Sequence, residues 1–165
     1  MRHWYLVHTK IRQEKVALEN LERQGYECLL PTILVEKLRG STLKVIEEPL
    51  FTRYMFIRLD DSLNAQSWSP IRSTMGVSRL VTFGHAPAKI EDALVEEIRV
   101  KTNSAQVLKR QFEKGDVVLV TKGPFAGIEA IFEMTDAQDR VMVLLTIMSK
   151  QVRMSASPAD IKKIY

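Results

Sequence analysis

The sequence has a single cysteine, so no disulfide can form within it. It also has no apolar run near the roughly 18 residues that a membrane span needs. The segment that begins at Met1 lacks the apolar region and small-residue cleavage site of a secretory signal. These absences predict a protein of the reducing cytoplasm that has no membrane partner.

Residue patterns that carry catalysis are also missing. There is no phosphate-binding loop and no nucleophile elbow, and Cys28 lies on a predicted strand as a small buried hydrophobe. Two adjacent acidic pairs, Glu47-Glu48 and Asp60-Asp61, should each point to opposite faces of a strand and so form no dyad. The histidines lack metal-ligand spacing: His3, His8 and His85. We expect no enzyme, no bound metal and no cofactor.

What remains is an ordinary folded composition with a mild basic excess. The 165 residues are 45% hydrophobic and 27% charged, with a net charge of +4 and a pI near 9.2. The excess is spread along the chain, so any nucleic-acid site must be a local patch. The length suits one domain, or one domain with a small module.

The first hundred residues predict an α+β domain. Trp4–Val7 reads as a buried strand. Gln13 to Gln24 has helical spacing and a C-terminal stop at Gly25, and Glu19 can pair with Arg23. Further strands are expected at Glu27 to Lys37, Thr42 to Phe51, Tyr54 to Leu59 and Val77 to Phe83, with a turn at Arg39-Gly40-Ser41 and a short helix near Trp68. A second helix follows Pro87, where Ile90, Leu94 and Ile98 recur every four residues. This order predicts an antiparallel sheet with helices packed on it, over residues 1–101.

The remaining residues divide into a polar linker, 102–113, and a small second domain, 114–165. The second domain opens with Lys114-Gly115-Asp116 before an apolar run, followed by Gly123-Pro124-Phe125-Ala126-Gly127. This arrangement resembles a KOW motif, which implies a small β-barrel. About fifty residues make a marginal core, so this domain needs support from a partner or neighbour.

Several segments of the first domain together resemble the N-terminal domain of the NusG family of transcription elongation factors. They are Trp4-Tyr5-Leu6-Val7, Leu21-Glu22-Arg23-Gln24, Pro31, Glu48-Pro49-Leu50-Phe51 with Tyr54-Met55-Phe56, and Gly76-Val77 leading to Phe83-Gly84. With the KOW motif the resemblance covers nearly the whole chain. Within the family, Ile131-Phe132 and the segment from Val143 to Lys150 look more like the specialised RfaH-like paralogues, as does the short length.

The resemblance implies a factor that binds the clamp coiled coil of RNA polymerase and the non-template DNA strand, and that suppresses pausing and termination. It also implies that the KOW domain contacts a ribosomal protein in several members. We expect a monomer. A general NusG-type elongation factor and a ribosome-associated KOW protein are the alternatives.

The resemblance places polymerase contacts on an apolar surface of the first domain. The expected residues are His8, Phe51, Tyr54, Val95 and Ile98. Exposed apolar patches often mark such contacts. The alternative is that Phe51 and Tyr54 are ordinary core residues.

Basic and polar side chains around the start of the first helix are expected to contact DNA. The expected set is Lys10, Arg12, Gln13, Lys15, Asn20, Arg72 and Thr74. Cations suit phosphates and an amide suits a base edge, whereas the alternative is a solvated helix face. Met75 stands where an RfaH-like pattern has arginine. Ser67-Trp68-Ser69 lies where such proteins contact the polymerase gate, unless Trp68 anchors its loop.

The second domain permits two shapes. With period two, Ile128, Ala130 and Phe132 share a side, which suits a barrel. With helical period, Phe125, Ile128 and Phe132 form one stripe, and Val141, Leu145, Met148 and Val152 form another. Only Gly127 weakens the helical interpretation. We expect a helical hairpin docked on the Phe51 and Ile98 surface, in which Glu48 pairs with Arg140 as the resemblance suggests, or a permanent barrel on a flexible linker.

Overall fold

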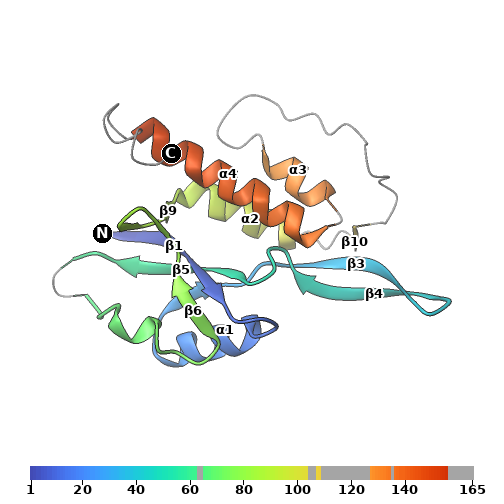
Figure 1. Cartoon of the computed structure of the whole chain (residues 1–165), viewed down its shortest axis with the longest axis horizontal. Coiled ribbons are helices and arrows are strands. Elements are labelled where there is room, and N and C mark those ends of the chain that lie inside the picture. The colour runs from blue at the N-terminus through green and yellow to red at the C-terminus, as the bar shows by residue number, and fades with distance from the viewer. Residues whose placement is uncertain (63–64, 104–106, 109–126, 135, 156–165) are drawn as a thin grey trace.

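An antiparallel sheet lies between helices in the computed structural model of this chain, which describes residues 1–62, 65–103, 107–108, 127–134 and 136–155. Helix α1 (Glu14–Arg23) covers one side of the sheet, and α2 (Asp92–Asn103) and α4 (Ala137–Ser155) lie on the other (Figure 1). This is the α+β architecture that the sequence predicts. No helix in these described ranges is long and apolar enough to cross a lipid bilayer.

Strand β1 (Arg2–Thr9) is the centre of the sheet. It pairs antiparallel with β5 (Tyr54–Asp60) on one edge, with Leu6 opposite Phe56. On its other edge it pairs with β6 (Val77–Leu80) and, closer to its start, with β9 (Lys89–Ile90). Strand β2 (Glu27–Leu29) completes the order β2-β5-β1-β6.

Alternation along β1 divides the core in two. Trp4 and Leu6 pack in a cluster with α2, α3 (Gly127–Glu133) and α4, whereas Tyr5 and Val7 pack in a second cluster against α1. All four side chains are at most 4% exposed. The unbroken apolar run at the start of the sequence is therefore the signature of a strand buried on both faces.

Helix α1 spans Glu14–Arg23 and ends as predicted. Gly25 has φ +93° and donates its N–H to Glu22, which satisfies a terminal carbonyl. Arg23 binds Glu19 at 2.8 Å on the exposed face. Ala17 and Leu21 face the sheet with no exposed surface.

The predicted single strand from Glu27 to Lys37 is wrong, because the chain divides it into β2 and β3 (Thr32–Arg39). Pro31 lies at the break, has no N–H to donate to a ladder, and accepts a bond from Leu50 through its carbonyl. Strand β3 pairs with β4 (Thr42–Pro49) around the predicted turn, and these two strands extend away from the main sheet (Figure 1). Strand β10 (Val107–Leu108) pairs parallel with β3.

The second helix begins later than predicted. Ile90 belongs to β9 and not to a helix, and α2 spans Asp92–Asn103. A two-stranded ribbon of β7 (Thr82–Phe83) and β8 (Ala86–Pro87) precedes it, so the predicted strand from Val77 to Phe83 is also divided. The short helix expected near Trp68 is confirmed as the 3₁₀ turn η1 (Ser69–Ile71).

The described part of the C-terminal segment is a helical hairpin. Helix α3 spans Gly127–Glu133, and α4 spans Ala137–Ser155. Both lie over α2 on the same side of the sheet (Figure 1). Of the two shapes that the sequence allows, this structure has the docked helices and not the barrel strands. Phe125 and residues 114–126 of the KOW-like motif lie outside the described residues.

Candidate functional site

An apolar surface of the first domain lies under the helical hairpin. We call it the covered surface and define it by Leu50, Phe51, Val95 and Ile98, which are at most 1% exposed, together with the partly buried Tyr54. Leu50 and Phe51 follow β4 in a bend, and Val95 and Ile98 lie on α2. Phe51 lies in that bend, outside any strand, whereas Tyr54 begins β5. Phe51 is buried in the cluster that contains the hairpin side chains, and its ring also meets that of Phe56 edge-on at 6.1 Å.

The hairpin supplies apolar side chains of its own to this interface. From α3 they are Ile128 and Ile131, and from α4 they are Leu144, Ile147 and Met148. All belong to one cluster with the covered surface, and Phe132, Val141, Val143 and Leu145 pack at its margin. The expected stripe through Val141 and Leu145 is therefore displaced on the helix. The buried stripe follows positions 140, 144, 147 and 148, a helical spacing that places these side chains on one face.

Arg140 joins the hairpin to the first domain at the centre of this interface. Its side chain has no exposed surface. It donates to the carbonyl of Leu50 at 2.7 Å, to that of Met134 at 2.9 Å and to Glu48 Oε1 at 2.8 Å. A buried guanidinium is tolerated when its donors and its charge are matched in this way.

Glu48 accepts from two cations. Its Oε2 lies 2.7 Å from Lys37 Nζ on the neighbouring strand, while Oε1 binds Arg140. Burial alone raises the pKa of Glu48, but the bonds from Lys37 and Arg140 outweigh burial and hold that pKa below its ordinary value. The carboxylate is therefore ionised at neutral pH, as the buried Arg140 requires.

Gly127 packs closely against α4. A Cβ at this position would lie 2.6 Å from Ile147 Cδ1 and 3.2 Å from Val143 Cγ1. From the sequence, a glycine at this position was expected to weaken a helix. In the structure its missing side chain instead permits the two helices to pack.

The DNA-contact candidates lie on α1 and in two loops that meet, one of which follows the C-terminal end of β1. We call Lys10–Gln13 and Arg72–Gly76 the paired loops. Lys10 N donates to Gly76 O at 2.8 Å, and Gly76 packs so closely on α1 that an added Cβ would lie 2.7 Å from Ala17 N. The cations of this region are exposed: Lys10, Arg12, Lys15 and Arg72. The fold thus gathers basic side chains from two separate stretches of sequence.

The polar candidates are placed differently. Gln13 is half-buried and precedes α1 as its N-cap, without a side-chain capping bond. Asn20 donates its amide to Val16 O at 2.7 Å. Thr74 is only 7% exposed, and its hydroxyl bonds Pro70 O and Gln24 at 2.8 Å each. The hydroxyl of Thr74 is therefore used to hold its loop.

Two residues with a Cβ have a left-handed backbone, one in the paired loops and one beside them. Arg12 has φ +60° and Arg53 has φ +68°, values uncommon for residues with a Cβ. Arg53 is held in place, because its N–H donates to the buried Glu14 and its Nε donates to Thr9 O at 3.1 Å. The sequence did not single out Arg53, since nothing in its local pattern signals a left-handed residue.

His8 lies between the two candidate regions. Its ring is 4.9 Å from that of Tyr54, its partner on β5, and Arg79 is its partner on β6. Burial, and then the charges of Arg53 and Arg79, lower the pKa of His8, so the imidazole is neutral at pH 7. Its Nδ1 is buried without a hydrogen-bond partner in the described structure.

Trp68 anchors its loop, which was one of the two interpretations open from the sequence. Its indole N–H donates to Asp60 O at 3.0 Å, and its ring packs edge-on against Tyr5 at 4.9 Å. The hydroxyl of Tyr26 holds the same loop through Ser67 O at 2.6 Å.

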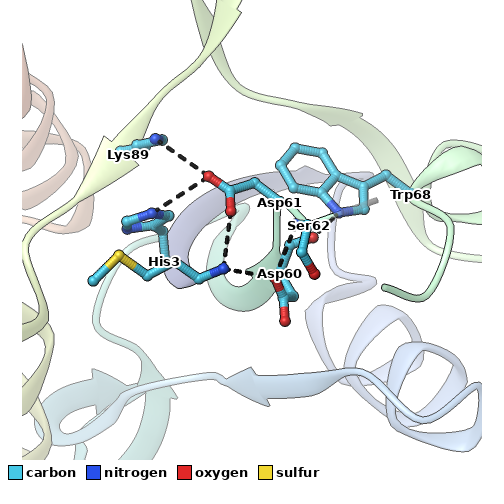
Figure 2. Close-up of polar contacts among 7 residues, drawn as sticks. His3, Asp60, Asp61, Ser62, Trp68 and Lys89 are labelled. Atoms are coloured by element: carbon cyan, nitrogen blue, oxygen red, sulfur yellow. Dashed lines mark hydrogen bonds and ion pairs between the residues drawn. The ribbon is translucent and has the colours of Figure 1, made fainter. Parts of the chain in front are cut away.

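One expectation about acidic pairs is wrong. Asp60 and Asp61 both accept from the Met1 amino group, at 2.9 and 3.1 Å, and Asp61 also faces His3 and Lys89 (Figure 2). They converge because β5 ends at Asp60, so strand alternation does not extend to Asp61. The bond from the amino group is the main cause that lowers the pKa of each carboxyl. Two ionised carboxylates matched by cations form a structural cluster and lack the raised pKa of a general acid.

Neither metal binding nor thiol chemistry has support in the described ranges. No group of three or more histidine, cysteine or acidic side chains there could hold a metal ion. Burial raises the pKa of Cys28 to about 12, which leaves it an unreactive thiol at neutral pH.

Sequence reasoning missed several residues of the interface. Leu50, Ile131, Leu144 and Ile147 are all buried in it. The helical spacing of Arg140, Leu144 and Ile147 could have indicated the buried face of this helix. That interpretation requires the charged Arg140 to be assigned to the buried face.

Comparison with known proteins identifies relatives along most of the chain. The family model described as "Transcription termination factor nusG" matches residues 2–99. The transcription termination/antitermination protein NusG of Thermus thermophilus is 30% identical over 90% of this chain and 91% of its own. That of Helicobacter pylori strain J99 is 33% identical over 87% and 88%. A solved structure concerning domain interaction in Thermotoga maritima NusG is similar with a TM-score of 0.45 and 21% identity, and covers 74% of this chain and 68% of its own.

Proposed function

This chain belongs to the NusG family, and we propose that it acts as a transcription elongation factor that binds RNA polymerase and suppresses pausing and termination. Its similar proteins in Thermus thermophilus and Helicobacter pylori are named for termination and antitermination. The proposed role is mechanical: the protein holds the polymerase clamp over DNA and uses no catalysis and no cofactor.

The covered surface is the proposed binding site for the clamp coiled coil. Its apolar side chains come from the bend after β4 and from α2, and all of them belong to the core cluster of β1 and β5, which suits a preformed surface for a helical partner. Tyr54 lies at its margin beside His8, and together they provide polar groups at the rim of an apolar centre. This division matches the usual anatomy of a protein interface.

The helical hairpin occupies the covered surface in this structure. Phe51 and Ile98 have no exposed area while α4 is docked, so polymerase helices cannot reach them. We infer that the protein is autoinhibited and becomes active when the hairpin leaves. This favours the specialised, operon-specific RfaH-like role over a general NusG-type factor.

Release should also change the shape of the hairpin. Helices of this size cannot bury their apolar stripe alone, whereas the period-two pattern of the same residues suits the small barrel of a KOW domain. We propose that the freed segment refolds as this barrel and contacts a ribosomal protein. The two packings would then differ by only a few kcal/mol, as in other fold-switching proteins.

The paired loops are the proposed contact for the non-template strand. Their exposed cations suit the phosphates, and they lie on the α1 side of the sheet, away from the hairpin (Figure 1). DNA and polymerase can therefore be engaged at the same time. In this arrangement Gln13 is the candidate for a base edge, while Asn20 and Thr74 support the loops.

Binding of the full chain to RNA polymerase tests the proposal. Glu48→Ala removes the carboxylate that matches buried Arg140, so it should release the hairpin and increase polymerase affinity at least about tenfold. Lys37→Ala removes an exposed partner of the same carboxylate and should change affinity little. Tyr54→Ala in the Glu48→Ala background should reduce the gained affinity.

The competing functions give different results. Binding to ribosomal subunits but not to polymerase, in both wild-type and Glu48→Ala protein, would identify a ribosome-associated protein. Equal, strong polymerase binding by both would identify a general factor. Mapping the protein across the genome separates the same roles, since a specialised factor gives narrow peaks and a general factor gives broad coverage.

A further inference from the structure

The bend at residues 50–53 joins β4 to β5, and its backbone is strained between two of the proposed polymerase contacts, Phe51 and Tyr54. Arg53 has φ +68°, a left-handed value that is uncommon for a residue with a Cβ. A bond from Tyr54 N to Phe51 O at 3.1 Å closes the turn. A strained backbone persists only where its surroundings fix it, so the contacts of Arg53 determine the shape of this part of the surface.

Three hydrogen bonds fix Arg53. Two are exchanged with Thr9, the last residue of β1: Thr9 N donates to Arg53 O at 2.8 Å, and Arg53 Nε donates to Thr9 O at 3.1 Å. In the third, the Arg53 N–H donates to Glu14 Oε1 at 3.2 Å. Thr9 has no exposed surface and Glu14 is 8% exposed. We call these three bonds the brace, because they fasten the bend to the end of β1 and the start of α1.

The brace does not involve the helical hairpin. On the hairpin side, Arg140 Nε donates to Leu50 O at 2.7 Å, and this bond is lost when α4 leaves the covered surface. Glu14 belongs to α1, which lies on the opposite side of the sheet from α4 (Figure 1). The bend therefore loses one of its holds on release and keeps the brace.

A surface that already has its binding shape avoids the cost of ordering it when the partner arrives. We propose that Arg53 and Glu14 are positioning residues, which keep Phe51 and Tyr54 in the shape that binds polymerase after the hairpin has left. They act through the brace, without touching polymerase themselves. The proposal rests on the polymerase contact proposed above and extends it to residues behind the surface.

Glu14 has a second role that must be separated from this one. An acidic residue in the first turn stabilises the N-terminus of a helix through its negative charge. The bond to Arg53 requires an acceptor oxygen and not a charge. Glu14→Gln removes the charge and keeps an acceptor oxygen, so it distinguishes the two roles.

Affinity of the full chain for purified RNA polymerase tests the brace. All proteins carry Glu48→Ala, which is expected to release the hairpin. The added changes are Glu14→Ala, Glu14→Gln, Arg53→Ala and the control Glu19→Ala, whose exposed carboxylate on α1 pairs with Arg23. Circular dichroism checks that each is folded. Arg53→Ala breaks the brace at Thr9 alone, so it provides the test if Glu14→Ala does not fold.

We expect Glu14→Ala to weaken polymerase binding about tenfold and Arg53→Ala about threefold or more, because each removes a bond that fixes the bend. Glu14→Gln should restore affinity to within about twofold, and Glu19→Ala should have no effect.

Double variants show whether the effect passes through the bend. Beside Tyr54→Ala, the loss from Glu14→Ala should shrink to about threefold or less, because one of the positioned side chains is gone. Beside Ile98→Ala, which alters the part of the surface on α2, the loss should remain about tenfold.

Three results would overturn the brace. They are unchanged affinity in both Glu14→Ala and Arg53→Ala, equal losses from Glu14→Ala beside Tyr54→Ala and beside Ile98→Ala, or no recovery in Glu14→Gln. Each leaves the polymerase contact in place, provided that Tyr54→Ala and Ile98→Ala themselves weaken binding. If those two changes leave affinity intact, the proposed polymerase surface and the brace both fail.

Discussion

Arg140 on α4 and Glu48 on β4 are 92 residues apart in the sequence, and their side chains meet at 2.8 Å in the interior. Arg140 is wholly buried, and the carboxylate of Glu48 is also bound by Lys37 at the surface. This contact couples the C-terminal hairpin to the first domain through a charge that cannot be left unmatched.

Replacing either partner should therefore release the hairpin. Arg140→Met keeps much of the volume but leaves the Leu50 carbonyl and Glu48 without their donor, and Glu48→Gln removes the matching charge. Each should weaken docking by about 3 kcal/mol. Hydrogen exchange of the α4 amides measures this directly. Lys37→Ala is the control, and α4 protection that is the same in all four proteins would contradict the prediction.

Docking should depend on pH only in the acid range. The pKa of Glu48 is lowered in the docked state, so its stabilisation is present above its ordinary pKa of 4.5 and is lost as the pH falls through the lowered value. Protection of α4 should be constant near neutrality and fall only once the pH drops below 4.5. Glu48→Gln should be less protected than wild type at neutral pH, and the difference should close on acidification. A difference that persists in acid would count against Glu48 as the cause.

Gly127→Ala should loosen the packing of α3 on α4. The added Cβ meets Ile147 Cδ1, and overpacking of this kind costs about 1–3 kcal/mol. Alanine returns up to about 1 kcal/mol through helix propensity, so a net loss is expected. Ile147→Val removes the clashing methyl, and the double variant should be more stable than the sum of the two changes predicts. Hydrogen exchange of α3 and α4 provides the measurement, and strict additivity would contradict the contact.

Gly76→Ala should destabilise the first domain strongly. The residue has φ +89°, and an added Cβ would lie 2.7 Å from the backbone nitrogen of Ala17, which cannot move as a side chain does. We expect a loss of about 3 kcal/mol or more in the free energy of unfolding. Gly40→Ala is the matched control, because Gly40 has φ +66° but no atom within 4 Å of the added carbon. Its loss should be about 1–2 kcal/mol from backbone strain alone. Denaturant unfolding compares the two, and equal losses would show that the contact with α1 does not matter.

The local elements were the most predictable part of the fold. Helix α1 has an apolar face and a glycine stop, both of which are properties of neighbouring residues. The buried run Trp4–Val7 likewise indicated its own strand. The errors lie at boundaries: Pro31 divides one predicted strand, and Ile90 belongs to β9 because it pairs with Trp4 instead of continuing towards α2. Such pairings are made by residues distant in sequence, so local periodicity cannot report them.

The candidate sites divide in the same way. The basic residues could be selected one by one from the sequence, but their meeting depends on the bond from Lys10 to Gly76. The hydroxyl of Thr74 accepts from Gln24, which is 50 residues away, and Asp60 and Asp61 converge on the Met1 amino group, which is 59 and 60 residues away. None of these relationships has a local signature.

The sequence by itself determined that the C-terminal segment has two admissible periods, one for helices and one for strands. It did so because Ile128 and Phe132 suit either pattern, and local propensity differs too little to select one. Tertiary structure decided between them. The docked helices bury their stripe against Phe51 and Ile98, and Glu48 matches the charge of Arg140. An isolated segment has neither the apolar surface nor the carboxylate, so the shape of this segment is a property of the contact it makes with the rest of the chain.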